Sequence, residues 1–322
     1  MSKHISVLLN ESIENLNIKE DGIYVDCTLG YAGHSSQILK RITRGCLFAF
    51  DQDGEAIEYS KKILGQINDN YEIINSNFVN IKSELNSRGI TSVDGILFDL
   101  GVSSPQLDES ERGFSFHNDA DLDMRMNQNQ ELDAKKVVNE YSENDLTRIF
   151  YEYGEEKYAR NIAKGIVKRR EEKKIETTLE LVDIIKENVP EKYKRDHHPA
   201  RKVFQAIRIE VNDELNVLKK ALVDGIDLLS PGGRMCVITF HSLEDRIVKN
   251  TFKKYSEVDK VYKGLPFIPD EYKAKVKLIG KFKPSKEELD NNNRSRSSIL
   301  RVIEKVKEWW IWKRIRRIEQ QD

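Results

Sequence analysis

The stretch that decides the fold of this chain reads Ile23-Tyr-Val-Asp-Cys-Thr-Leu-Gly-Tyr-Ala-Gly-His-Ser-Ser36. It begins as a short run of β-branched and aromatic residues, turns at a glycine, and continues into a helical pattern over residues 35–42. Gly30 and Gly33 would let the backbone approach a ligand closely, and the helix that follows would present its first N–H groups there. This pattern is typical of the strand, loop and helix that cradle a nucleotide.

A second apolar run, Cys46–Phe50, ends in Asp51. An acidic residue at the tip of the second strand is where such a unit binds the two hydroxyls of a ribose. The loop offers only Gly30-x-x-Gly33, so the glycine pattern that packs a pyrophosphate is incomplete. A nucleoside cofactor without a pyrophosphate fits better, and S-adenosylmethionine is the candidate. The alternative is that the glycines merely form a tight turn and Asp51 caps a helix.

The composition excludes several classes of protein. The 322 residues are enough for one large domain or two ordinary ones. The 53 Lys and Arg residues balance 54 Asp and Glu residues, so any site for a polyanion must be a local patch. Neither a membrane-spanning run nor a signal peptide is recognisable, which predicts a cytoplasmic protein. The three cysteines, Cys27, Cys46 and Cys236, lie far apart in apolar runs, so we expect buried thiols and no disulfide or zinc site.

Two further strands are predicted, over residues 71–74 and 93–99, with helical patterns between them. This alternation predicts an α/β fold with a parallel, doubly wound sheet whose ligands bind at the carboxyl ends of the strands. Asp51 and Asp99 both lie at such ends. Phe78, just after the third strand, could flank an adenine ring or simply close the core. The polar turn that follows Asp99 stands where a methyltransferase carries its catalytic loop.

The strand and helix alternation then stops, and short basic helices follow. We predict four parts: residues 1–106 and 200–304 as two pieces of one domain, 107–199 as a helical insertion, and 305–322 as a basic, Trp-rich tail. The Lys and Arg residues of the insertion could contact phosphates or form an ordinary solvated face. His197 and His198 have no ligand partners at metal spacing, so no metal site is predicted.

The second piece of the domain contains a long helical pattern over 200–229 and a strand over 234–240 that runs into His241. His241 is a candidate for substrate contact or proton handling, or alternatively a cap for the next helix. Arg294 and Arg296 lie among small polar residues and suit phosphate binding. The tail could contact RNA, a partner groove or a membrane face, or dock on its own domain.

With these residues assembled, the chain resembles the RsmH (MraW) family of 16S ribosomal RNA cytosine-N(4)-methyltransferases. The resemblance covers nearly the whole chain up to about Ile303, and the tail lies outside it. Several blocks in the expected order carry it: His4–Glu11, Asp26–Ser35, Asp99–Asp108, Arg112–Phe116, Phe204–Glu214, Phe240–Arg246 and Arg294–Ser297. The chain departs from the family where Ser6 replaces a proline and Ala32 replaces a glycine.

The resemblance implies a Rossmann-like S-adenosylmethionine-dependent methyltransferase fold with an inserted all-helical domain for substrate recognition. The methyl group would go to the exocyclic 4-amino group of a cytidine in the decoding region of 16S rRNA. The substrate would be that RNA, within the small ribosomal subunit, with no obligatory membrane partner and with a homodimer left open. By matched position, the cofactor contacts would be Ala32, Gly33, His34, Asp51, Phe78, Asp99 and Gln106.

Catalysis requires the poorly nucleophilic amine to be held in line with the methyl group. Carbonyls and hydroxyls of Ser103-Ser104-Pro105 could hold it, Asp99 and His241 are further candidates, and no single general base is assigned. We hypothesise that the target base is splayed out and stacked on Phe114 or Phe116, with Arg112, Arg294 and Arg296 as further RNA contacts. Two alternatives stay open: an amino-methyltransferase acting on DNA or another substrate, and a non-catalytic ribosome assembly factor.

Overall fold

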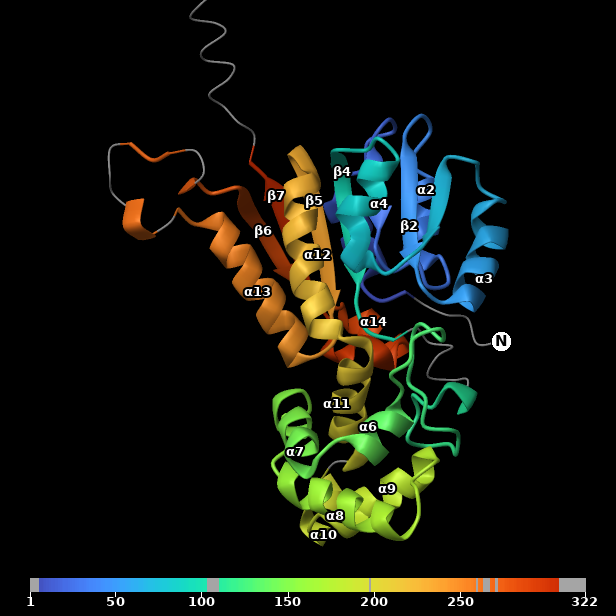
Figure 1. Cartoon of the computed structure of the whole chain (residues 1–322). Helices are drawn as coiled ribbons and strands as arrows, with labels where there is room; N and C mark the ends of the chain where they lie inside the picture. The colour runs from blue at the N-terminus through green and yellow to red at the C-terminus, as the bar shows by residue number, and fades with distance from the viewer. Residues whose placement is uncertain are drawn as a thin grey trace, which may run out of the picture. The chain divides into compact units, whose positions relative to one another are not determined.

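The computed structural model of the chain describes residues 6–102, 110–196, 198–258, 260–262, 267–269 and 272–306 (Figure 1). The chain divides into two compact units. The sheet unit contains the chain up to Gly101 and from Val217 onward, and the helical unit runs from Val102 to Asn216. From the sequence we expected these borders near residues 106 and 200, so the second border lies further along the chain than expected.

The sheet unit is built on seven strands in the order β3-β2-β1-β4-β5-β7-β6. Neighbours from β3 to β5 are parallel, whereas β7 is antiparallel to both β5 and β6. The chain moves outward from β1 through β2 to β3 and then returns to β4 on the other side of β1, which makes the carboxyl ends of β1, β2 and β4 a topological switch point. The strands are β1 (Ile23–Asp26), β2 (Cys46–Asp51), β3 (Tyr71–Asn75), β4 (Val93–Asp99), β5 (Leu229–Thr239), β6 (Val276–Phe282) and β7 (Ile299–Lys305).

Helices cover both faces of this sheet (Figure 1). Because side chains alternate along a strand, Val25, Phe48 and Val237 pack in one core with α4, α12 and α13, and Tyr24 and Leu47 pack in the other with α1, α2 and α3. The sheet-unit helices are α1 (Leu9–Leu16), α2 (Gly33–Leu39), α3 (Gly54–Leu64), α4 (Ile81–Ser87), α12 (Glu214–Leu228), α13 (Ser242–Ser256) and α14 (Lys286–Asn291), with short 3₁₀ turns η1 (Phe78–Asn80), η3 (Lys260–Tyr262) and η5 (Asn293–Ser297).

The helical unit has its own apolar core, drawn from all its larger helices. Capping side chains define where several helices begin: Asp133 accepts from the backbone N–H of Lys136, Ser142 does the same for α7, and Thr177 forms a capping box with Glu180. The elements are η2 (Ser110–Arg112), α6 (Ala134–Glu140), α7 (Glu143–Glu152), α8 (Ala159–Glu172), α9 (Thr178–Glu187), α10 (Glu191–Asp196) and α11 (Ala200–Asn212).

Two features differ from the sequence prediction. The helix expected over 200–229 is two helices, α11 and α12, because Asp213 adopts a left-handed conformation (φ 48°) that ends α11. Strand β6 was not predicted, since it is an edge strand in which only Val276 is buried, and such a strand lacks a clear apolar face. The mixed α/β, Rossmann-like fold itself is confirmed. No helix in the described part of the chain has the length and apolarity needed to cross a membrane.

Close packing of the turns that precede β1 and β2 generates a prediction. A Cβ atom added at Gly45 would lie 1.9 Å from the backbone oxygen of Gly22, whereas one added at Gly54 would meet nothing within 4 Å. We therefore expect Gly45→Ala to lower the free energy of unfolding by about 1–3 kcal/mol, because backbone must move. Gly54→Ala, the matched control, should be neutral or stabilise by about 0.4–1 kcal/mol. Urea denaturation of the two variants checks this, and equal midpoints would contradict the packing described.

Candidate functional site

Three carboxylates lie at the carboxyl edge of the sheet. Strand β1 lies between β2 and β4, and Asp26 is paired with Ala49 on one side and Leu97 on the other. Asp51 and Asp99 each follow those partners by two residues, at the ends of their strands. The sheet register therefore places the two predicted aspartates on either side of the β1 end, as the sequence indicated.

The turn between β1 and α2 has a left-handed backbone at two positions. Gly30 has φ 48°, and Ala32, the N-cap of α2, has φ 61°. Ala32 is fully buried and carries a side chain in a conformation that costs an L-residue about 1–2 kcal/mol. Gly33 follows as the first residue of α2.

Asp51 anchors this turn. Its Oδ2 accepts the backbone N–H of Gly30 at 2.8 Å, and its Oδ1 accepts those of Gln52 (2.8 Å) and Asp53 (2.9 Å). Burial raises the pKa of Asp51 to about 6, although the hydrogen bonds oppose that rise. Each carboxylate oxygen can accept about two hydrogen bonds, so Oδ2 retains capacity for one more donor. The carboxylate is thus fixed in place and still able to bind a hydroxyl.

The carboxylate of Asp99 differs from that of Asp51 in its hydrogen bonds. Its Oδ2 lies 3.5 Å from Nδ1 of His34, and its buried Oδ1 makes no hydrogen bond to any residue that the structure describes. Burial raises the pKa of Asp99 well above its usual range, and the negative charges of Asp26, Glu244 and Glu288 raise it further. A buried acceptor without a donor is costly, so this atom marks a place where a donor from a ligand would fit.

Asp26 is a residue of this edge to which the sequence analysis gave no role. Its buried carboxylate accepts from Ser35 Oγ at 2.7 Å and from the backbone N–H of Thr28 at 3.1 Å. Thr28 Oγ1 in turn accepts the backbone N–H of Asp99 at 2.7 Å. Asp26 therefore connects the tip of β4 to the start of α2. An acidic residue ending a buried strand, with no cation near it in sequence, was the signal that could have revealed it.

The other candidate site residues of the sheet unit lie in different surroundings. Phe78 is half-buried, and its ring meets that of Phe98 edge-on at 5.6 Å. His241 is the N-cap of α13, where its Nδ1 accepts the backbone N–H of Glu244 and its Nε2 lies 3.1 Å from Glu244 Oε1. His241 therefore caps helix α13, as in the second of the two roles that the sequence suggested for it. Ser103, Ser104, Pro105 and Gln106 lie outside the described residues.

Arg294 and Arg296 are both exposed, on the short turn η5. The turn is held from beneath by Ser295, which is buried and whose Oγ donates to the backbone oxygen of Asn292 at 2.7 Å. Alternation of buried serine and exposed arginine directs the two guanidinium groups to the surface of the sheet unit. This placement is compatible with the predicted phosphate contact.

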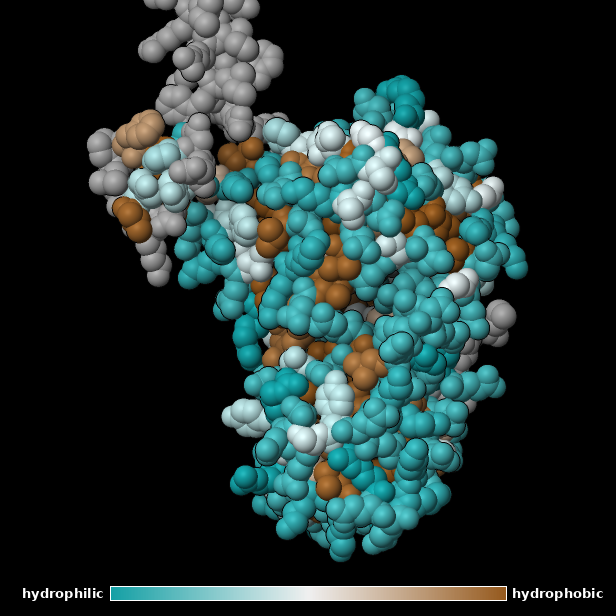
Figure 2. Space-filling model, viewed as in Figure 1, coloured by the Kyte–Doolittle hydropathy of each residue, from teal (hydrophilic) through white to brown (hydrophobic). Residues whose placement is uncertain are grey.

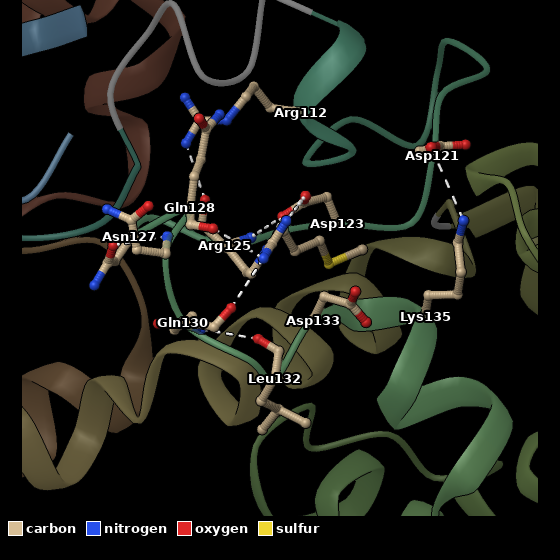
Figure 3. A network of polar contacts seen from close by, with 12 residues as sticks. Arg112, Asp121, Asp123, Arg125, Asn127, Gln128, Gln130, Leu132, Asp133 and Lys135 are labelled. Atoms are coloured by element: carbon tan, nitrogen blue, oxygen red, sulfur yellow. Dashed lines mark hydrogen bonds and ion pairs between the residues drawn. The ribbon is translucent and has the colours of Figure 1, made fainter. Parts of the chain in front are cut away.

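In the helical unit, Arg112 is a structural residue. It is buried, and its Nη2 donates to the backbone oxygen of Arg125 at 2.9 Å (Figure 3). Arg125 itself forms a two-pronged contact with Asp123, at 2.9 and 2.7 Å, and donates to the carbonyls of Gln128 and Gln130. The prediction that Arg112 contacts RNA is corrected on this ground, because its guanidinium is used to hold the loop before α6.

Phe114 and Phe116, the two residues predicted to stack on the target base, differ in their burial. Phe114 is buried in the core of the helical unit. The prediction that it stacks on a base is therefore wrong, since its ring is enclosed by other apolar side chains. Phe116 is only partly buried, and it stacks on His198 with ring centroids 4.5 Å apart and meets Phe204 edge-on at 5.7 Å. His198 is thus part of an aromatic cluster.

Comparison with known proteins identifies the family. The model of the MraW methylase family matches residues 1–306. The chain belongs to the MraW methylase family. A relative from Exiguobacterium sibiricum, named ribosomal RNA small subunit methyltransferase H, is 55% identical over 312 residues, which cover 96% of this chain and all of the relative. Among solved structures, an rRNA methylase from Streptococcus thermophilus matches 95% of this chain and 99% of its own, with 12% identity and a TM-score of 0.44.

Membership in the MraW methylase family confirms the resemblance and the enzymatic activity predicted from the sequence. The match ends at residue 306, so it includes only the first two residues of the predicted tail, 305–322. The sequence blocks that carried the resemblance include the turn, Asp51 and Asp99 described above.

The different burial of the two phenylalanines generates a prediction. Phe114→Ala should lower the free energy of unfolding by about 3–5 kcal/mol, because it leaves a cavity in the core of the helical unit. Phe116→Ala should cost clearly less, since that ring is already partly exposed. Thermal unfolding of the whole chain measures both, and Phe114→Leu is the control that keeps most of the buried volume. Equal losses for the two alanine variants would show that Phe114 is not the core residue described.

Proposed function

We propose that this MraW methylase transfers a methyl group from S-adenosylmethionine to the exocyclic 4-amino group of a cytidine in the decoding region of 16S rRNA, within the small ribosomal subunit. The observation that carries the proposal is the relative named ribosomal RNA small subunit methyltransferase H, which this chain matches over that protein's full length at 55% identity. The geometry of the sheet edge supports the cofactor part of it.

The residues present fit S-adenosylmethionine, which when bound supplies an electrophilic methyl group on a sulfonium. Asp51 retains one acceptor position on Oδ2 and would bind a ribose hydroxyl. The left-handed turn at Gly30 and Ala32 follows β1 at the same edge of the sheet, and Phe78 has a half-buried ring that would flank the adenine. Asp99, with its unused buried oxygen, would accept a donor from the ligand. Gly33, His34 and Gln106 complete the proposed set.

Asp99 also suits proton handling. A carboxylate whose pKa is raised by burial and by nearby carboxylates is a stronger base than an ordinary aspartate. Methylation of an exocyclic amine releases a proton from that nitrogen, so a hydrogen bond from the amine to such a carboxylate would stabilise the developing charge. We propose this role for Asp99, with the Ser103-Ser104-Pro105 turn positioning the amine. Alignment of the two reacting groups contributes about 7–11 kcal/mol in well-oriented reactions.

The proposed reaction predicts a defined product. Labelled S-adenosylmethionine, incubated with this protein and with small ribosomal subunits that lack the modification, should yield label in N4-methylcytidine after nucleoside digestion. Naked 16S rRNA and DNA are assayed in parallel, and Asp99→Ala serves as the variant that should lose most activity. Label found in DNA alone would indicate that the protein is instead a DNA amino-methyltransferase. Cofactor binding without transfer to any substrate would favour a non-catalytic assembly factor.

The raised pKa of Asp51 predicts how cofactor binding depends on pH. Above pH 6 the carboxylate is ionised and accepts a ribose hydroxyl, whereas below pH 6 it takes up a proton. We therefore expect the affinity for S-adenosylhomocysteine, measured by calorimetry, to fall by up to about tenfold per pH unit below pH 6. In Asp51→Asn the affinity should be lower at pH 8, and this step should be absent.

The same shift acts on stability in the opposite direction. Because the folded state binds this proton more tightly than the unfolded chain does, the contribution of Asp51 to stability is present below its ordinary pKa of 3.8 and is lost as the pH rises through about 6. If the cofactor affinity changed with pH identically in the wild type and in Asp51→Asn, Asp51 would not be part of the cofactor site.

A further inference from the structure

One face of helix α8 carries a row of cations. Arg160, Lys164 and Lys168 follow one another at intervals of four residues, and Lys157 lies just before the helix begins. All four side chains are exposed, whereas Ile162 and the other buried residues of α8 face the core. Four residues of helix rise by about 6 Å, so the charges of Arg160, Lys164 and Lys168 line up along the helix axis. We call these four residues the α8 row.

Other cations of the helical unit differ from the α8 row because acidic groups or carbonyls already bind them. Arg169 pairs with Glu187 and Lys173 with Glu180, at 2.8 and 2.7 Å. Arg170 donates to the backbone oxygens of Val138 and Tyr141. In the described part of the chain, by contrast, Arg160, Lys164 and Lys168 form no ion pair.

The acidic residues around the α8 row do not neutralise it within the described structure. On neighbouring helices, Glu152 lies 3.6 Å from Arg148 and Asp183 lies 3.9 Å from Lys186. Glu156, next to Lys157, is buried and accepts the hydroxyl of Tyr193 at 2.6 Å. Exposed glutamates lie at both ends of the row, Glu155 just before it and Glu171 and Glu172 at the carboxyl end of α8.

Helix α10 extends this basic surface. The ammonium of Lys157 lies over the rings of Tyr158 and Tyr193, 5.0 and 4.8 Å from their centroids. Tyr193 belongs to α10, so the exposed Lys192 and Arg195 of that helix lie next to the start of the α8 row. Figure 2 shows mainly hydrophilic residues on the visible face of the helical unit.

The chemistry of this face selects the kind of partner. A membrane-binding helix combines basic residues with exposed apolar ones, but the outward positions of α8 carry only charged and polar side chains. A row of evenly spaced, uncompensated cations suits a polyanion whose charges recur along a backbone. We propose that the α8 row binds phosphates of the ribosomal RNA substrate. This inference rests on the proposed function and names the residues of the helical unit that would contact the RNA backbone.

The test replaces Arg160, Lys164 and Lys168 together by glutamine, which retains helix propensity. Binding of a 16S rRNA transcript is measured between 50 and 300 mM salt. Loss of three phosphate contacts should weaken binding at least about tenfold near 150 mM salt and lower the slope of log affinity against log salt by about 2–3, because each contact contributes roughly 0.7–0.9. Affinity for S-adenosylhomocysteine should not change.

The matched control removes the same charge elsewhere on the helical unit, at Lys135, Lys173 and Lys186, each of which lies near an acidic partner. This control variant should bind RNA nearly as the wild type does. An equal loss in both triple variants, or an unchanged slope in the α8 variant, would overturn the inference. A wild-type protein that neither binds nor methylates ribosomal RNA would instead overturn the proposed function, so the two failures are distinguishable.

Discussion

The hydrogen bond from the backbone N–H of Gly30 to Asp51 Oδ2 is the contact on which the carboxyl edge of the sheet depends. The same carboxylate accepts two further N–H groups at the start of α3, so one side chain joins the turn after β1, the end of β2 and the next helix. Buried backbone donors must find acceptors, and here a single anion satisfies three of them. The carboxylate of Asp51, which we propose binds the ribose, is therefore a group that the fold already requires.

Buried carboxylates bring negative charge to the same edge of the sheet. Asp26 and Asp99 are close enough for the charge of one to raise the pKa of the other, and burial raises both pKa values. Asp26 is stabilised by hydrogen bonds from Ser35 and Thr28, whereas Asp99 keeps one oxygen without a donor in the described structure. Stability alone would not favour that arrangement, and such local conflicts are typical of functional sites. The asymmetry between the two residues separates a structural carboxylate from a candidate functional one.

The arginines and lysines of the helical unit also divide into two classes. Arg112 and Arg125 are bound by loop carbonyls and by Asp123, so they organise the segment that leads into α6. The cations of the α8 row are exposed and are not bound in this way. Net charge hides this division, because 53 basic and 54 acidic residues nearly cancel over the whole chain. Only the positions of the ion pairs show where positive charge is left uncompensated.

Local patterns in the sequence determined the parallel sheet, the turn at Gly30, the acidic strand ends and the helical insertion, because periodicity and glycine placement act over a few residues. They also carried the resemblance to the MraW methylase family. Tertiary structure decided the rest. Whether Phe114 is a core residue, Arg112 a loop anchor or His241 a helix cap depends on neighbours distant in sequence or on cap geometry, and the break at Asp213 depends on a single backbone angle. Residue type and spacing are the same in either case, so burial and hydrogen-bond partners alone distinguish them.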